Sequence, residues 1–168
     1  IDEIMDTDFF KNNTSEETAE LVRQYGIRNS QLLTIAPTGS LSTMIGVSGG
    51  IEPIFANYYE RKTETLHGHD QSYKIYTPIV KEYMDSHNID DDMDLPDWFI
   101  TAQTLSYKER VDMQSTWQYH IDAAISSTVN VPQEFTVEQT EDLYIYAWEM
   151  GLKGITIFRD KCKRLGIL

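Results

Sequence analysis

The residues with the clearest chemical potential form the turn Ala36-Pro37-Thr38-Gly39-Ser40-Leu41-Ser42, which follows an apolar run. When such a turn joins a buried strand to a helix, successive backbone N–H groups converge and the helix adds the positive end of its dipole. This geometry stabilises anions, phosphate above all, and the hydroxyls of Thr38, Ser40 and Ser42 can add donors. No Lys follows the glycine, so the turn is not the GxxxxGK[ST] loop of nucleoside triphosphatases. The alternative interpretation is a structural, capped turn.

Glu52 is a carboxylate at the start of an otherwise apolar stretch, after Gly49-Gly50 and before Pro53. Burial would raise its pKa or require a hydrogen-bond donor as partner. We therefore expect Glu52 to pair with an N–H or hydroxyl group as a structural anchor. Catalysis by this carboxylate is the alternative.

Metal binding is not expected. His67-Gly68-His69-Asp70 could present two imidazoles and a carboxylate, but no further ligand set with zinc spacing accompanies them. The acidic run from Asn88 to Asp94 lacks the central Gly and the closing Glu of a calcium loop, which predicts a solvated loop. The single cysteine, Cys162, cannot form an internal disulfide and suits a reducing compartment, where we expect it to be a bystander.

The composition bounds the class of protein. The 168 residues include 40% hydrophobic ones, enough for the core of one domain, and carry a net charge of −13. This charge opposes contact with nucleic-acid phosphates. No apolar run reaches the ~18 residues of a membrane span, and Ile1-Asp2-Glu3 lacks the features of a signal peptide. We expect a soluble, cytoplasmic protein that binds neither nucleic acid nor membrane.

Predicted elements of the first half place the turn between a strand and a helix. The run 30–36 predicts a strand that ends at Pro37, residues 42–45 a brief helix, and the stretch 51–59 another strand. Upstream, Thr14-Ser15-Glu16-Glu17 supplies a cap and first-turn acids for a helix over 15–25.

The middle of the chain, residues 60–107, is the least regular part and is expected to be an irregular insertion. Within it, Thr77-Pro78 predicts the start of a helix that runs to about His87, because Pro is tolerated in a first turn. No linker or repeat divides the chain, so we treat 1–168 as a single segment.

Helix and strand patterns alternate in the second half. An apolar stripe with steps of four, four and three predicts a helix over 106–125 with the stripe in the core: Met113, Trp117, Ile121 and Ala124. Residues 126–131 predict a strand, and 154–158 predict another. Between them, the capping box that starts at Thr136 predicts a helix ending at Gly151, with three core residues: Leu143, Ala147 and Met150. This order favours parallel pairing in an α/β fold.

Five segments of the chain, in this order and spacing, resemble the C-terminal part of the catalytic chain of ribonucleotide reductases. They span about residues 20–160: Tyr25-Gly26-Ile27-Arg28-Asn29-Ser30-Gln31-Leu32, Ala36-Pro37-Thr38-Gly39-Ser40-Leu41-Ser42, Ser48-Gly49-Gly50-Ile51-Glu52-Pro53, Ile125-Ser126-Ser127-Thr128-Val129-Asn130-Val131-Pro132 and Gly151-Leu152-Lys153-Gly154-Ile155-Thr156-Ile157-Phe158-Arg159-Asp160. One segment alone would be a weak signal, whereas five in sequence are specific.

The resemblance implies a fold and a site. The family fold is a ten-stranded α/β barrel of two parallel half-barrels, and this chain resembles part of the second half, with about four strands. The family binds substrate phosphates at the Pro-Thr-Gly-Ser turn, mainly through backbone N–H groups and hydroxyls. Carried over, the contacts are Pro37, Thr38, Gly39, Ser40 and Leu41, and the residues expected to support the site are Asn29, Ser42 and Glu52.

The resemblance also implies a subclass. Family members fed by a separate radical-generating subunit have two consecutive tyrosines on the last barrel strand, where this chain reads Ile155-Thr156-Ile157-Phe158. The sequence therefore resembles the adenosylcobalamin-dependent subclass, whose complete enzymes reduce ribonucleoside di- or triphosphates and take electrons from a thioredoxin-like reductant.

Departures from the family pattern limit this chain's share of the reaction. The family needs a radical cysteine, a nearby Asn and Glu, and a reducing cysteine pair, whereas this chain has only Cys162. We therefore expect a C-terminal segment without catalytic residues, inactive alone, which works with the remaining N-terminal part of the reductase. The alternatives are a non-catalytic nucleotide-binding or assembly module derived from the same fold, and an unrelated phosphosugar-binding domain, which would leave the later motifs unexplained.

Overall fold

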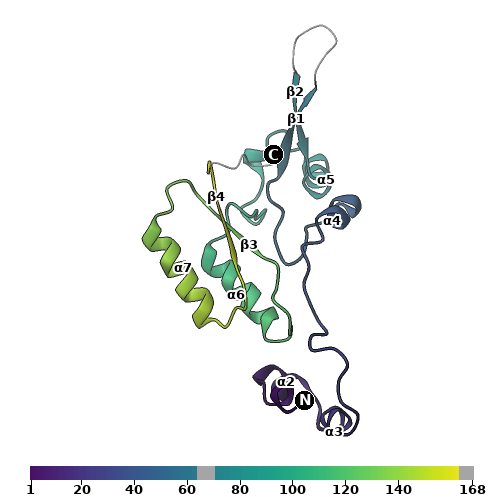
Figure 1. Cartoon of the computed structure of the whole chain (residues 1–168). Coiled ribbons are helices and arrows are strands. Elements are labelled where there is room, and N and C mark those ends of the chain that lie inside the picture. Colours follow the sequence, from purple (N-terminus) through teal and green to yellow (C-terminus); the bar gives the residue numbers. More distant parts are fainter. Residues whose placement is uncertain (64–70, 163–168) are drawn as a thin grey trace.

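The computed structural model describes residues 1–63 and 71–162, so the His67–Asp70 group lies outside the described residues. Three helices at the N-terminus, α1 (Asp2–Met5), α2 (Asp8–Asn13) and α3 (Glu16–Tyr25), form one end of the molecule. A long extended segment leads from them to α4 (Gly39–Ile45), as Figure 1 shows. The predicted helix over 15–25 is confirmed, and the Ser15 hydroxyl caps it by accepting a hydrogen bond from the Thr18 N–H.

The central unit is a pair of parallel strands, β3 (Thr128–Val131) and β4 (Thr156–Arg159), in register from Thr128 opposite Thr156. Helices α6 (Tyr107–Gln118) and α7 (Val137–Glu149) pack beside this pair (Figure 1). Buried side chains of one core cluster join the strands to α7: Val129, Val131, Phe135 and Leu143. The predicted parallel pairing is confirmed.

Helix α7 begins as its sequence predicts. Thr136 and Gln139 form a reciprocal capping box, in which each side chain binds the other residue's backbone N–H. Leu143 and Ala147 are buried as expected, whereas Met150 is exposed at the C-terminal end of the helix.

Helix α6 differs from its prediction in length and in the face that it buries. It ends at Gln118, and Met113 and Trp117 of the predicted stripe are about half exposed. The buried face instead carries Arg110, Val111, Gln114 and Gln118. Its three polar side chains donate to backbone carbonyls. Arg110 donates to Thr128 and Gln114 to Gly154, whereas Gln118 donates to both Ile121 and Ala123. The stripe was wrong because hydrogen bonds to loop carbonyls let long polar side chains occupy the interior.

The two strands predicted in the first half are wrong as regular strands. Residues 30–36 are extended but form no ladder, although the carbonyls of Leu33 and Ile35 accept hydrogen bonds from the backbone N–H groups of Ala123 and Ser126, both at 3.1 Å. The stretch 51–59 reaches strand geometry only at Tyr58. Backbone contacts such as those of Leu33 and Ile35 depend on residues far away in the sequence, and a local residue pattern carries no information about them.

The region 60–107, expected to be irregular around one helix, contains further regular elements. Strand β1 (Tyr58–Thr63) pairs antiparallel with β2 (Gln71–Tyr76) in a hairpin that projects from the molecule (Figure 1). Helix α5 (Pro78–His87) follows, with Pro at its first position as predicted. The acidic run contains a short 3-10 helix, η1 (Asp92–Asp94), and Asp92 forms an ion pair with Lys74 of the hairpin.

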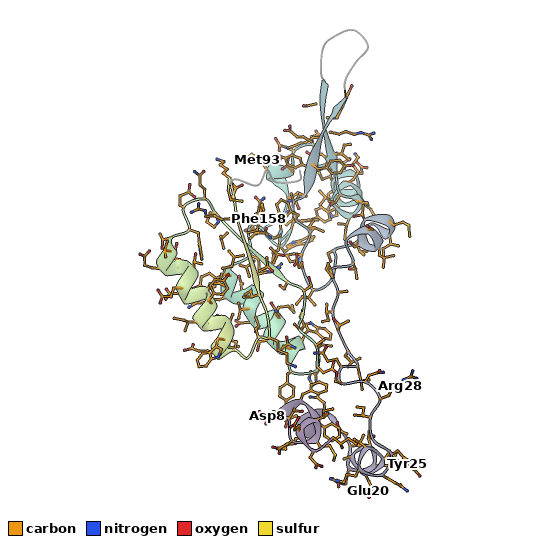
Figure 2. All side chains as sticks on the ribbon, viewed as in Figure 1. Asp8, Glu20, Tyr25, Arg28, Met93 and Phe158 are labelled. Carbon is orange, nitrogen blue, oxygen red and sulfur yellow. The ribbon has the colours of Figure 1, made fainter. Side chains whose placement is uncertain are left out.

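The N-terminal end lies apart from the parallel strands, as the labelled residues of Figure 2 show. Phe158 on β4 lies near the centre of the molecule in Figure 2, whereas Glu20, Tyr25 and Arg28 lie at the N-terminal end. Within residues 1–63 and 71–162, none of the helices has both the length and the apolar character that crossing a membrane requires.

Candidate functional site

The turn predicted to bind anions leads directly into α4, whose first residue is Gly39. Thr38, the N-cap residue, has left-handed backbone angles (φ 50°, ψ 25°) and no side-chain cap bond. The N–H groups of Gly39, Ser40 and Leu41 belong to the first helical turn, which has no internal acceptor for them. Within the described residues these three groups donate to no other atom, and the turn is exposed. They are therefore available to an external acceptor.

The glycine pair Gly49-Gly50 holds the turn in place from one side. The Gly50 N–H donates to the Thr38 hydroxyl at 2.9 Å, which ties the unusual backbone of Thr38 to a segment twelve residues away. A Cβ atom on Gly49 would lie only 2.8 Å from the Pro37 carbonyl oxygen and 3.1 Å from the Ser42 hydroxyl. Two of the recognised sequence segments thus meet, with a backbone-to-backbone approach that only glycine permits.

The predicted anchor role of Glu52 agrees with its contacts. Its own N–H donates to the Gly49 carbonyl at 3.0 Å, and its carboxylate accepts a 2.5 Å hydrogen bond from the Thr128 N–H at the start of β3. The segment that holds the turn is therefore fixed to the parallel strands.

Arg110, on α6, is a residue of this network that the sequence reasoning missed. Its side chain is 4% exposed, and its Nη2 donates to the Thr128 carbonyl at 2.5 Å and lies 3.8 Å from the Glu52 carboxylate. Burial lowers the pKa of this guanidinium and the Glu52 charge opposes that effect, yet an arginine stays protonated at neutral pH. The sequence shows only that the helix contains one Arg and two glutamines. This pattern does not distinguish a buried Arg from an exposed one.

The remaining predicted site residues have different surroundings. Ser42 is buried, and its hydroxyl donates to the Gly39 carbonyl at 2.9 Å, so it tightens the first turn of α4 and is not among the exposed donors. Ser40 and Leu41 are exposed. Asn29 is exposed and makes no hydrogen bond within the described part of the chain, so its supporting role stays a prediction.

Asp122 fixes the extended segment that leads to the turn, and sequence reasoning missed it as well. Its two carboxylate oxygens accept hydrogen bonds from the N–H groups of Leu32 and Leu33, at 2.5 and 2.7 Å. Partial burial acts to raise the pKa of Asp122, but these backbone hydrogen bonds outweigh it and hold the pKa below its usual value. The Asp122 carboxylate thus accepts hydrogen bonds from two successive N–H groups that a neighbouring strand would bind in a regular sheet.

A separate pocket of about 130 Å³ lies at the carboxyl ends of β3 and β4. It is lined by residues of both strands, of the positions directly after them and of two other loops: Phe55, Gln103, Asn130, Val131, Pro132, Phe158 and Asp160. None of the turn residues 37–41 contributes to it, so the pocket and the turn are different features.

The parallel strands and the helices beside them form a portion of an α/β fold, and the turn before α4 presents N–H groups that have no partner among the described residues. The family model "Ribonucleotide reductase, barrel domain" matches residues 2–158. The chain belongs to the ribonucleotide reductase barrel domain family.

Curated relatives agree with this family. The chain is 31% identical, over 84% of its length, to the vitamin B12-dependent ribonucleoside-diphosphate reductase of Thermoplasma acidophilum. It is also 31% identical, over 79% of its length, to the Mycobacterium tuberculosis protein of the same name, and 29% identical, over 88%, to the ribonucleoside-diphosphate reductase subunit alpha of Treponema pallidum. The chain covers 20%, 21% and 16% of these proteins, so it spans about a fifth of their length.

A solved structure shows the same fold. The class Id ribonucleotide reductase alpha subunit of Actinobacillus ureae superposes with a TM-score of 0.64 at 24% sequence identity, covering 85% of this chain and 29% of that one. The predicted α/β fold, as part of the reductase barrel, is confirmed.

Proposed function

We propose that this chain supplies the substrate-phosphate turn and part of the barrel wall of a ribonucleotide reductase that converts ribonucleoside di- or triphosphates to 2′-deoxyribonucleotides. We assign the phosphate contacts to the turn residues Pro37, Thr38, Gly39, Ser40 and Leu41. The donors are the backbone N–H groups and hydroxyls from Thr38 onward, because Pro37 has no N–H and borders the phosphate only by position. Fixing the phosphates places the ribose against radical chemistry performed by other residues of the complete enzyme, so the chain contributes positioning rather than proton transfer.

The observation that carries this proposal is the set of free N–H groups of Gly39, Ser40 and Leu41 on a turn that is held rigidly from behind. Donors fixed in advance bind an anion without the cost of ordering a loop. Three convergent N–H groups at a helix start also match phosphate better than they match a cation or an apolar group.

The complete enzyme is proposed to be of the adenosylcobalamin-dependent type, which generates the radical at the cofactor. Two of the relatives named above carry vitamin B12 dependence in their names. The last strand region reads Ile155-Thr156-Ile157-Phe158 and lacks the two consecutive tyrosines that family members with a separate radical-generating subunit have there. The described residues do not fit the cofactor by themselves. The pocket at the ends of β3 and β4 is much smaller than a corrin ring. We therefore assign no step of the reaction through the cofactor to these residues.

The partners of the chain follow from the same proposal. They are the ribonucleotide substrate, the remaining N-terminal part of the reductase and, for the complete enzyme, a thioredoxin-like reductant in the cytoplasm. Contacts with nucleic acid are not proposed, because the net charge of −13 repels phosphate backbones wherever donors are not specifically arranged.

Ser40→Asp tests the site in the complete reductase that contains this segment. The new carboxylate lies beside the bound phosphates, and the repulsion between like charges should raise the dissociation constant of a ribonucleoside diphosphate at least about tenfold, or ~1.4 kcal/mol. Ser72→Asp is the matched control, because it adds the same charge to an exposed serine of the hairpin. Equilibrium binding measures both variants, and equal affinities for Ser40→Asp and the unmodified enzyme would remove the site assignment.

A further inference from the structure

The position of the phosphate turn depends on a chain of contacts that reaches α6. The turn is held by Gly50, whose N–H binds the Thr38 hydroxyl, and by the close approach of Gly49 to the Pro37 carbonyl. Both glycines belong to a short loop that closes with the Glu52 N–H on the Gly49 carbonyl. A displacement of Glu52 would therefore move the glycine pair and, with it, the backbone of Thr38.

Glu52 in turn is held at the backbone of one residue, Thr128. The Thr128 N–H donates to the Glu52 carboxylate, and the Thr128 carbonyl accepts from the Arg110 guanidinium. Both charged groups therefore bind the backbone of the same residue of β3. The two charged groups also approach each other, with 3.8 Å between Arg110 Nη2 and the Glu52 oxygen that binds Thr128. These three residues form a closed triangle in which each contact restrains the other two.

The triangle has one unused donor. Arg110 Nη1 is buried and has no hydrogen-bond partner within the described part of the chain. An unpaired buried donor costs free energy, as does a buried cation without a nearby anion. The Glu52 carboxylate is the charge that offsets Arg110, and Arg110 is the charge that keeps Glu52 directed at β3.

We propose that Arg110 is a positioning residue for the substrate-phosphate turn and acts on it through Glu52 and the Gly49-Gly50 pair. Within the described residues the hydrogen bonds and the ion pair of Arg110 go to Ser127, Thr128 and Glu52, and none of them goes to the turn. This inference rests on the proposed function of the turn. It adds a residue on another element, α6, that sets the affinity of the turn for phosphate.

The test compares Arg110→Met with Gln114→Met in the complete reductase. Gln114 is the next buried polar residue on the same face of α6, but its amide donates to the Gly154 carbonyl and not to the Glu52 network. Both variants should lower the melting temperature. Only Arg110→Met should raise the dissociation constant of a ribonucleoside diphosphate, by about tenfold, the equivalent of one charge-assisted hydrogen bond. Inorganic pyrophosphate, which lacks ribose and base, should show the same selective loss.

Two further variants keep the inference testable where Arg110→Met does not fold. Arg110→Lys retains the charge and one donor and should recover part of the affinity, whereas Glu52→Gln should weaken pyrophosphate binding as Arg110→Met does. In kinetic assays KM should rise while kcat changes little, because the affected contacts are those of binding.

The outcomes separate this inference from the function on which it rests. If Ser40→Asp weakens binding but the Arg110 and Glu52 variants bind pyrophosphate as the unmodified enzyme does, the positioning role is refuted and the site stands. Equal losses of affinity in Arg110→Met and Gln114→Met would also refute it, since the effect would then be a general loss of structure. If Ser40→Asp itself has no effect, both assignments fail.

Discussion

Replacing Gly49 by alanine should displace the phosphate turn without substituting any residue that is assigned to contact phosphate. The added Cβ would lie 2.8 Å from the Pro37 carbonyl oxygen, whereas ordinary van der Waals contact begins near 3.4 Å. One backbone must therefore retreat by about 0.6 Å, and neither is a flexible side chain that could rotate away. Overpacking of this kind costs about 1–3 kcal/mol, and it strains the hydrogen bond between the Gly50 N–H and the Thr38 hydroxyl.

Gly154→Ala provides the matched control for this substitution. A Cβ on Gly154 would meet only the Ala124 Cβ, at an ordinary 3.8 Å, so the substitution should be nearly neutral. We expect Gly49→Ala to lower the melting temperature of the complete reductase and to raise the dissociation constant of a ribonucleoside diphosphate about tenfold, with Gly154→Ala near the unmodified values. Differential scanning calorimetry and equilibrium binding make the comparison.

The reasoning would be refuted if Gly49→Ala and Gly154→Ala were indistinguishable in both measurements. A loss of stability with unchanged phosphate affinity would refute the narrower claim that the glycine pair sets the position of the turn. Either result would mean that the backbone around Thr38 adjusts freely, contrary to the restraints described above.

Two other predictions concern stability. Asp122→Asn should destabilise the protein by about 1–2 kcal/mol, because the amide oxygen cannot accept from the Leu32 and Leu33 N–H groups as well as a carboxylate does. Since the folded pKa of Asp122 lies below the unfolded value, its stabilising effect is complete above pH ~4 and is lost as the pH falls through the folded pKa. Melting curves between pH 3 and 7 should thus show a weaker acid dependence for Asp122→Asn, and an unchanged dependence would contradict the assignment. The isolated 168-residue chain should be marginally stable or aggregate, because large apolar side chains such as Leu32, Leu41 and Ile45 are more than 60% exposed. Circular dichroism and a thermal melt test this, and a sharp, reversible transition of a monomer would count against it.

Local elements could be predicted from the sequence because their causes are local. The cap at Ser15, the proline that starts α5 and the capping box of α7 each act within four residues, and all three helices are present. The turn that leads into α4 could be predicted for the same reason, since its small residues and the helix start follow one another in the chain, and its binding of anions stays a prediction.

Features that depend on distant partners could not be predicted in this way. The extended segment 30–36 is held by Asp122, ninety residues away from Leu32, and by two carbonyl contacts rather than by a regular ladder. On α6 the hydrophobic pattern predicted Trp117 in the core. Arg110 and Gln114 are buried instead, because they donate hydrogen bonds to carbonyls of β3 and of the loop before β4. Periodicity measures apolar character and does not include the hydrogen bonds that satisfy a buried polar side chain.

The sequence by itself determined the helix boundaries marked by caps, the alternation of helix and strand in the second half and the family-specific segments, because these follow from neighbouring residues. Only the tertiary structure decided that Gly49 lies against Pro37, that Glu52 reaches Thr128 and that Arg110 completes the contact from α6. The physical reason is that these contacts join residues between 12 and 76 positions apart, and their geometry exists only after the helices and strands have packed.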